Sequence, residues 1–240
     1  MVTLNDLVGI NNLKIYQNDD WFKFSLESVL LPHFVTINLR CKYILDLCTG
    51  NAPIPMILST MTSAKIVGVE IQKDVAELAI KSVKYNNLEN QIEIINENLN
   101  NLKNIYNSDT FDVITVNPPY FKNEANSLKN LDEHKMIARH EVTTNLEDIV
   151  KVSSYLLKNN GYIAMVHRTE RFFEITHLLE KNNLIPKRVQ FIYPKENSES
   201  NLFMIECMKN GKNGVKFLKP LYIHNADGTY RDEIKKIFNI

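Results

Sequence analysis

Short apolar runs rich in β-branched and aromatic residues alternate with segments of helical periodicity between residue 43 and about residue 180. Runs of this length between polar turns are typical of strands, whereas helices repeat apolar residues every three or four positions. In Lys73–Tyr85 that apolar stripe consists of Val75, Leu78, Ala79 and Val83. Strands that alternate with helices predict an α/β fold, with a mostly parallel sheet and helices on both faces. The expected strands are Tyr43–Leu47, Lys65–Ile71, Gln91–Ile95, Phe111–Val116 and Gly161–Val166, and the expected helices are Pro53–Thr60, Lys73–Tyr85 and Leu146–Leu157.

Two further strand patterns, Arg188–Tyr193 and Asn201–Met208, are separated by a short polar turn. Parallel neighbours need a long crossover, so these two are expected to pair antiparallel at the far edge of a seven-stranded sheet. Residues 18–38 are expected to form a helix ahead of the sheet. Residues 121–144 are expected to form a mobile loop over the active site, because long connections in compact domains are usually functional. Residues 1–240 are expected to form a single domain.

Charge is distributed unevenly along the chain, although the net charge is zero. Residues 1–149 carry six more acidic than basic residues, and residues 150–240 carry six more basic than acidic residues. This asymmetry is compatible with an anionic partner on the C-terminal half and equally with an ordinary solvated surface. The chain has no apolar run of membrane-spanning length and no secretory signal pattern at its N-terminus, so a cytoplasmic location is expected. Its three cysteines form no C-x-x-C pair and its six histidines are scattered, so no metal site is expected.

The turn after the first expected strand has the features of a nucleotide-binding turn. It runs from Asp46 to Ala52, contains Gly50 and leads into a helix. Glu70 ends the second strand, where an acidic side chain can accept both hydroxyls of a ribose and disfavours a phosphate. The third strand leads to Asn98, whose amide is placed to read the edge of an adenine. An ordinary strand–helix turn and a solvated carboxylate are the alternatives.

The fourth expected strand ends in Asn117-Pro118-Pro119-Tyr120, at the same edge of the sheet. The two prolines fix φ and lack N–H groups, so their carbonyls remain available as acceptors. The Asn117 side-chain oxygen and the Pro118 carbonyl can each accept a hydrogen from a planar amino group and stabilise the positive charge that develops on its nitrogen. Tyr120 offers an aromatic face for a planar base. Adenine, cytosine, guanine and a glutamine amide all remain possible acceptors.

These motifs together resemble those of the class I, Rossmann-like methyltransferases. The family's first motif usually reads D-x-x-x-G-x-G; Asp46 and Gly50 match it, and Ala52 replaces the last glycine, a change that is tolerable if its φ stays negative. Asn98 stands where the family more often has Asp. The resemblance implies S-adenosylmethionine as the cofactor, and the absence of a G-x-G-x-x-G motif argues against NAD. The implied cofactor-binding residues are Ser25, Glu27, Asp46, Thr49, Gly50, Asn51, Glu70, Ile71, Asn98, Leu99 and Asn117.

Three flanking segments are similar to elements of the bacterial valine-tRNA adenine methyltransferases. They are Phe24–Leu31 (F-S-L-E-S-V-L-L, with Glu27 where Asp is usual), Ala138-Arg139-His140-Glu141, and Pro220–Ile223 followed by Gly228-Thr229-Tyr230 and Glu233. The resemblance runs over nearly the whole chain. It implies methylation of the exocyclic amine of adenine 37, next to the anticodon of a valine tRNA. It also places Ser25 and Glu27 near the methionine end of the cofactor.

Candidate contacts with the substrate are less well defined. Arg139 and His140 either hold the loop or contact phosphate, and Tyr120 and Lys122 lie beside the catalytic motif. The basic turn from Lys209 to Gly214, followed by Lys216, either contacts RNA or is simply solvated; its candidate residues are Lys209, Lys212 and Lys216.

Three other functions remain open. Protein-glutamine methyltransferases share N-P-P-Y but typically carry a separate N-terminal helical domain, whereas about 40 residues precede the sheet here. Ribosomal-RNA guanine amino methyltransferases usually have a duplicated fold or Phe after the prolines. The non-enzymatic alternative is an RNA-binding module, and the presence of both Asn117 and Glu70 argues against it.

Overall fold

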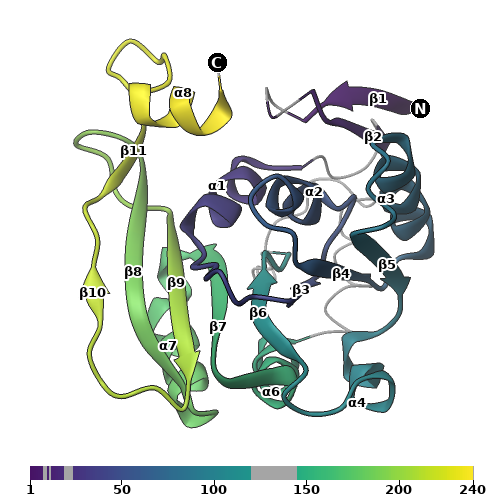
Figure 1. Ribbon diagram of the computed structural model, residues 1–240. Coiled ribbons are helices and arrows are strands. Elements are labelled where there is room, and N and C mark those ends of the chain that lie inside the picture. The colour runs from purple at the N-terminus through teal and green to yellow at the C-terminus, as the bar shows by residue number, and fades with distance from the viewer. Residues whose placement is uncertain (8–9, 11, 19–23, 120–144, 240) are drawn as a thin grey trace, which may run out of the picture.

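The computed structural model describes residues 1–7, 10, 12–18, 24–119 and 145–239 (Figure 1). The expected active-site loop at 121–144 and Tyr120 lie outside this part of the chain. No helix among the described residues has the length and apolar character needed to cross a bilayer.

Nine strands of the described residues form the main sheet, in the order β10-β8-β9-β7-β6-β3-β4-β5, with β11 also paired to β8. The five strands from β7 to β5 are mutually parallel, and β9 is antiparallel to both β7 and β8. The expected α/β fold with a mostly parallel sheet and antiparallel C-terminal strands is therefore confirmed. The strands are β3 (Tyr43–Leu47), β4 (Lys65–Glu70), β5 (Ile92–Asn96), β6 (Phe111–Val116), β7 (Leu157–Arg168), β8 (Leu184–Lys195), β9 (Leu202–Lys209), β10 (Lys216–Phe217) and β11 (Leu221–His224).

The far edge of the sheet differs from the prediction. β8 and β9 are antiparallel as expected, but β9 lies inside the sheet, and the short strands β10 and β11 pair with the outer side of β8. The expectation of seven strands is therefore wrong. Strands of two and four residues are too short for apolar alternation to identify them.

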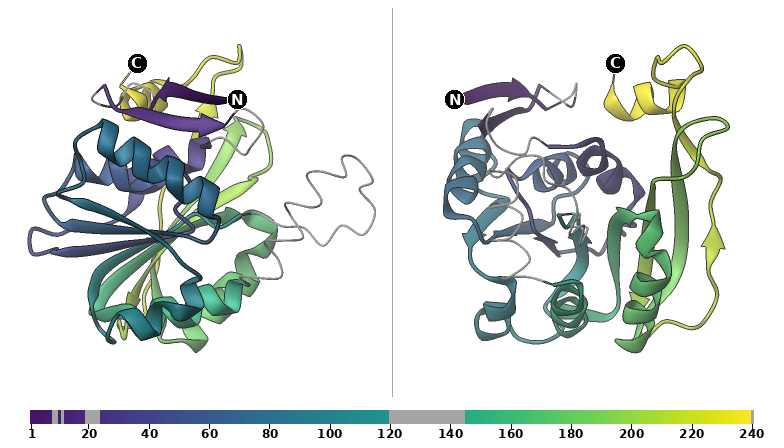
Figure 2. Two further views of the ribbon diagram at one scale, coloured as in Figure 1. Left: turned by 90° about the vertical axis from the view of Figure 1, so that its right-hand side faces the viewer. Right: turned by 180° about the vertical axis from the view of Figure 1, so that it is seen from behind.

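Helices cover both faces of the sheet, as Figure 2 shows with the sheet seen edge-on. Adjacent residues of β3 point to opposite faces of the sheet. Ile44 packs in the first apolar cluster, and its neighbour Leu45 packs in the second. The first cluster includes residues of α1 (Leu26–Phe34), α2 (Pro53–Ser59), α3 (Lys73–Tyr85) and α8 (Asp232–Phe238). The second includes residues of η1 (Leu99–Asn101), α4 (Leu102–Ile105), α6 (Leu146–Leu156) and α7 (Phe172–Lys181), and η2 (Thr169–Arg171) precedes α7.

The N-terminal segment is only partly helical in its described residues. Of the helix expected at residues 18–38, the described part is helical only in α1, whose N-cap residue is Ser25. Ahead of it, β1 (Val2–Asp6) and β2 (Lys14–Asn18) form an antiparallel hairpin that the sequence analysis did not predict. The hairpin is joined to α3 because the backbone N–H of Tyr16 donates to Ser82 Oγ at 2.9 Å.

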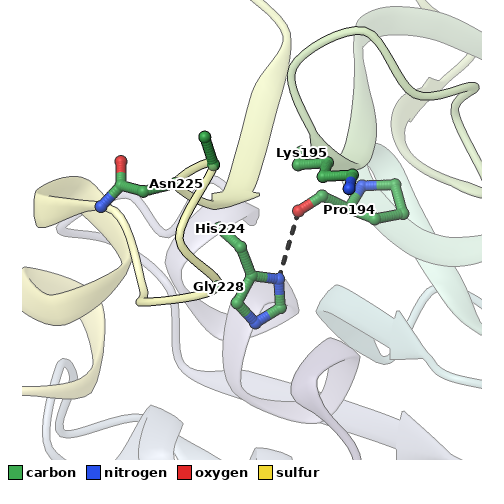
Figure 3. Close-up of a pocket in the computed structure, with 6 residues that line it drawn as sticks. Pro194, Lys195, His224, Asn225 and Gly228 are labelled. Carbon is green, nitrogen blue, oxygen red and sulfur yellow. Dashed lines mark hydrogen bonds between the residues drawn. The ribbon is translucent and has the colours of Figure 1, made fainter.

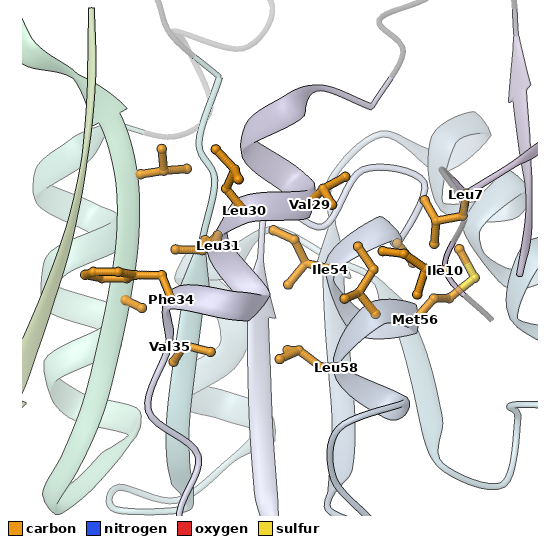
Figure 4. Packing of buried hydrophobic residues seen from close by; sticks show 14 of the residues in the cluster. Leu7, Ile10, Val29, Leu30, Leu31, Phe34, Val35, Ile54, Met56 and Leu58 are labelled. Carbon is orange, nitrogen blue, oxygen red and sulfur yellow. The ribbon is translucent and has the colours of Figure 1, made fainter. Parts of the chain in front are cut away.

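The helix α1 is held firmly in the core. Its residues Val29, Leu30 and Leu31 are each no more than 1% exposed and belong to the apolar cluster that also contains Ile54 of α2 (Figure 4). Just beyond α1, the carboxylate of Glu206 in β9 accepts a hydrogen bond from the backbone N–H of Thr36 at 2.6 Å. The same carboxylate pairs with Arg188 of β8, Nε to Oε1, at 2.9 Å. The C-terminal end of α1 is thus fixed relative to the sheet.

Candidate active site

Four parallel strands bring the candidate site residues to one edge of the sheet (Figure 1). In the register of the sheet, Leu47 lies beside both Val69 and Val116, and Glu70 lies beside Asn96. The turn after β3, the end of β4, the end of β5 and Asn117 after β6 therefore share the carboxyl edge. This is the edge where open α/β sheets bind their ligands.

The turn after β3 has an unusual backbone. Cys48, Gly50 and Ala52 have φ of +57°, +56° and +66°, a region that glycine enters freely and other residues enter at a cost. The condition for tolerating alanine here, a negative φ at Ala52, is therefore not met: the turn has the left-handed conformation that a glycine would adopt more easily. Close packing supports the turn from below, because a side chain on Gly68 of β4 would approach Thr49 Oγ1 to 2.9 Å.

Asp46 supports this turn from within the core. Its carboxylate is completely buried and accepts hydrogen bonds from the hydroxyls of Thr49 and Thr115, each at 2.6 Å. Burial raises the pKa of Asp46 to about 7, although the two hydroxyls act in the opposite direction. Asp46 thus has a structural position beneath the turn. Thr115 was not predicted, although a single hydroxyl in the apolar run of β6 was a visible signal.

Glu70 faces the turn from the end of β4 and is 5% exposed. Its Oε2 accepts from the backbone N–H of Gly50 at 3.0 Å, and its Oε1 accepts from the backbone N–H of Gln72 at 2.9 Å. Each carboxylate oxygen has a second lone pair for a further donor. Glu70 is therefore oriented by the backbone and retains the capacity to accept two hydroxyls.

Neighbouring amides tie the surrounding segments together. Asn51 donates from Nδ2 to the carbonyl of Tyr16 at 2.6 Å, which joins the turn to β2. Asn96 donates from Nδ2 to the carbonyls of Glu70 and Ile71, at 2.8 and 3.0 Å, and so fixes the end of β4. Asn96 was not among the predicted site residues.

Asn98 and Leu99 occupy the start of η1. Asn98 Oδ1 accepts from the backbone N–H of Asn100 at 3.0 Å, so this oxygen caps the short helix. Leu99 is buried in the second apolar cluster. The Nδ2 group of Asn98 is therefore the part suited to donating a hydrogen bond to an adenine edge.

The predicted catalytic motif begins where β6 ends. Asn117 is half-buried, Pro118 is buried and Pro119 is exposed. Asn117 Nδ2 donates to the hydroxyl of Ser28 in α1 at 3.0 Å. Ser28 is 5% exposed and was not predicted, although it lies one helical turn after Ser25 in the segment F-S-L-E-S-V-L-L.

The predicted residues at the start of α1 lie on the same helix as Ser28. Ser25 is the N-cap residue and its carbonyl accepts from the backbone N–H of Ser28 at 3.1 Å. Glu27 is half-buried in the first turn, where a negative charge is favoured by the helix dipole. The segment F-S-L-E-S-V-L-L therefore supplies three polar side chains within four residues of one another.

Lys209, a predicted basic contact among the described residues, does not lie beside Asn117. Lys209 Nζ donates to Asp109 Oδ1 at 2.9 Å and to the carbonyl of Leu157 at 2.7 Å, and its side chain is 14% exposed. Leu157 begins β7, so Lys209 lies at the amino edge of the parallel strands, opposite the site. Lys212 and Lys216 are exposed and follow Lys209 in the chain. The remaining candidates, Tyr120, Lys122, Arg139 and His140, lie outside the described residues.

A shallow pocket of about 260 Å³ lies at the carboxyl ends of β8 and β11 (Figure 3). It is lined by Lys195, His224 and four small or polar neighbours, and His224 Nδ1 lies 3.2 Å from the carbonyl of Pro194. None of the predicted cofactor residues lines it. Within the described ranges, no group of three or more His, Cys, Asp or Glu residues is arranged to hold a metal ion.

Comparisons with known proteins agree with this arrangement. A tRNA1(Val) (adenine(37)-N6)-methyltransferase of Parabacteroides distasonis is 28% identical over 184 residues, covering 77% of this chain and 76% of that protein. One of Bacteroides thetaiotaomicron is 26% identical over 236 residues, covering 97% and 95%. A release factor glutamine methyltransferase of Aliivibrio fischeri is 30% identical over 174 residues, covering 70% of this chain and 59% of that protein.

Solved structures give the same fold. The crystal structure of a predicted O-methyltransferase from Agrobacterium tumefaciens superposes with a TM-score of 0.70 at 17% identity, over 88% of this chain and 95% of that one. The sheet is thus that of a class I methyltransferase. The family model described as a methyltransferase domain matches residues 41–219. This match includes both Asp46 and Asn117. The chain therefore belongs to the methyltransferase domain family.

Proposed function

We propose that this methyltransferase transfers the methyl group of S-adenosylmethionine to the N6 amino group of adenine 37 in a valine tRNA. The observation that carries the proposal is the position of the Asn117 amide, at the end of β6 and on the same sheet edge as the Glu70–Gly50 contact. The two tRNA methyltransferases described above support the choice of substrate, because their similarity extends over most of the chain.

The residues at the sheet edge fit an adenosyl cofactor. A side chain placed on Gly50 would meet no atom of the described residues within 4 Å, so this part of the chain leaves the space above the turn open to a ligand. Beside it, Glu70 is a buried acceptor with lone pairs suited to the two hydroxyls of a ribose. Asn98 Nδ2 is a donor for an adenine nitrogen, and Ser25 and Glu27 are assigned to the methionine end. When bound, S-adenosylmethionine supplies an electrophilic methyl group on a sulfonium, so no metal or covalent intermediate is required.

The protein's contribution to the reaction is alignment and charge stabilisation. Asn117 Oδ1 and the Pro118 carbonyl accept the two hydrogens of the adenine N6 group, which directs the nitrogen lone pair toward the methyl group. As the bond between N6 and the methyl carbon forms and the sulfonium S–CH3 bond breaks, positive charge develops on the nitrogen, and the two oxygens stabilise it. Loss of one N6 proton to solvent then gives the neutral methylated amine. Tyr120 stacks on the base. Adenine 37 must leave the stack of the anticodon loop to reach Asn117, as in other enzymes that modify a base.

The release factor glutamine methyltransferase defines the second candidate function, because a glutamine amide also presents a planar NH2 group to Asn117. The experiment offers the purified protein and radiolabelled S-adenosylmethionine three substrates: a valine tRNA transcript, the same transcript with guanine at position 37, and a release factor. We expect label only in the first, recovered as N6-methyladenosine by mass spectrometry. Label in the release factor alone would refute the tRNA assignment, and equal label in both transcripts would refute position 37.

A further inference from the structure

The Asn117 amide contacts a second residue that neither the motif nor the comparisons assign a role. Asn117 Nδ2 donates to Ser28 Oγ at 3.0 Å, and Ser28 is 5% exposed within α1. We propose that Ser28 is a positioning residue that holds the Asn117 amide with its oxygen toward the substrate amino group. The inference rests on the proposed function, in which Asn117 accepts a hydrogen from that group.

An asparagine side chain needs such a support because its terminal torsion is soft and its two orientations have nearly the same shape. With Oδ1 toward the substrate, the amide accepts a hydrogen; rotated by half a turn, it presents its own N–H groups to the donors of the substrate. A bound base also removes water from the amide, so the Nδ2 group then benefits from an acceptor within the protein. The Ser28 hydroxyl supplies that acceptor and restricts the rotation.

The position of Ser28 is set by the core and not by Asn117. Its neighbour Val29 and the following Leu30 and Leu31 are no more than 1% exposed and pack among residues of α1 and α2 (Figure 4). After α1, Thr36 is bonded through its backbone N–H to Glu206 of β9. A helix fixed in this way offers the Ser28 hydroxyl at a defined point, and the more adaptable Asn117 side chain aligns with it.

Replacement of Ser28 tests the proposal because it should lower kcat without weakening the binding of either substrate. We expect Ser28→Ala to lower kcat by about 10- to 100-fold, which corresponds to about 1.4–2.7 kcal/mol of lost transition-state stabilisation. The KM for tRNA and the Kd for S-adenosylmethionine should change less than threefold, because Ser28 touches neither in this proposal. Ser28→Thr, which keeps the hydroxyl, should recover most of kcat, and Ser28→Cys, with a weak acceptor, should be intermediate. Kinetics on tRNA and calorimetric titration of the cofactor provide these values.

A matched control comes from Ser153 in α6, which is also a buried helical serine, at 0% exposure, and lies on the other face of the sheet. Ser153→Ala should leave kcat unchanged. Urea unfolding of each variant establishes that differences in kcat are measured on folded protein.

The same Ser28 substitution in an Asn117→Asp variant distinguishes an effect through the amide from a general packing effect. In Asn117→Asp both side-chain oxygens are acceptors, so orientation no longer matters. Ser28→Ala should then lower the residual kcat less than threefold. Equal fold losses in the two backgrounds, or an unchanged kcat for Ser28→Ala in the wild-type background, would overturn the role of Ser28. Retention of full activity by Asn117→Ala would instead overturn the proposed function, so the two failures are distinguishable.

Discussion

Glu70 combines a structural position with a proposed binding position in one carboxylate. Its oxygens accept from the backbone N–H groups of Gly50 and Gln72, and both are left with lone pairs at the open sheet edge. Spacing along the sequence was enough to select Glu70, because an acidic residue at the end of the second strand is a recurrent feature of nucleotide sites. Its two backbone partners depend on the conformation of the turn and were not predictable from spacing.

The isosteric replacement Glu70→Gln should weaken cofactor binding by about 10- to 100-fold. One oxygen becomes an N–H donor that faces another donor, and hydrogen bonds to a charged acceptor contribute about 1.5–3 kcal/mol. Calorimetric titration with S-adenosylmethionine measures the change. Glu77→Gln, on an exposed position of α3, is the control and should bind normally. Unaltered affinity in Glu70→Gln would remove Glu70 from the cofactor site.

The backbone of Ala52 has a conformation that its sequence context did not predict. It is completely buried and has φ of +66°. Ala52→Gly should change the free energy of unfolding by less than about 1 kcal/mol, because relief of backbone strain and loss of one buried methyl are of similar size. Ala52→Val should destabilise by at least about 2 kcal/mol, since a branched side chain is both strained at positive φ and too large. Urea unfolding compares the two, and equal stability would show that the turn relaxes.

At the scale of elements, a link through Glu206 joins the end of α1 to the antiparallel strands β8 and β9. Glu206 is 1% exposed and accepts from the Thr36 backbone, the Thr36 hydroxyl and Arg188. Arg188 also lies over the ring of Phe34, 4.8 Å from its centroid. The two ends of this link are about 170 residues apart in sequence, which explains why local pattern analysis does not reveal it.

Glu206→Ala should lower the free energy of unfolding by about 3 kcal/mol, because it leaves the charge of Arg188 and two donors of Thr36 without their acceptor. Urea denaturation followed by fluorescence measures the loss. The pair between Lys151 and Glu147 on α6 is a matched control, since both of its side chains are about half exposed. Glu147→Ala should cost no more than about 0.5 kcal/mol. A loss of that small size for Glu206→Ala would show that the link contributes little.

Elements with a strong periodic pattern were predicted well, and those defined by distant contacts were not. The bounds of β3, β6 and α3 match the expected ranges residue for residue. The β1–β2 hairpin was not predicted: its strands are five residues each, and β2 is fixed by the backbone bond from Tyr16 to Ser82 of α3. β10 and β11 are likewise defined by pairing with β8. In each case the stabilising partner is remote in sequence.

Across the whole molecule, the charge asymmetry of the sequence gives no position for an RNA-contacting surface. Lys209, one of the basic residues that make up the C-terminal excess, is paired with Asp109 at the sheet edge opposite Asn117. The charge of Lys209 is therefore neutralised within the protein. Charge counted along a chain has no position in space, whereas residues that follow neighbouring parallel strands can be placed at one sheet edge from the sequence.

Two buried titratable groups, Asp46 and His167, should change the free energy of unfolding with pH in opposite directions. Burial raises the pKa of Asp46 from 3.8 to about 7. Its contribution to stability is therefore complete below about pH 4 and is lost as the pH rises toward 7. For His167, which is 2% exposed, burial and then the positive charge of Arg171 lower the pKa from 6.5 to about 4. Its contribution is complete above pH 6.5 and is lost as the pH falls toward 4. Between pH 4 and 6.5 the two effects oppose each other.

Single substitutions should expose each effect separately. Relative to wild type, Asp46→Asn should gain stability as the pH rises from 4 to 7, by up to about 4 kcal/mol, since each pKa unit corresponds to about 1.4 kcal/mol. His167→Gln should gain relative stability as the pH falls from 6.5 to 4, and the double variant should follow the wild-type profile most closely. Free energies of unfolding in urea between pH 4 and 8 provide the comparison. Parallel profiles for wild type and Asp46→Asn would mean that the Asp46 carboxyl titrates normally, since the hydroxyls of Thr49 and Thr115 would then fully offset the cost of its burial.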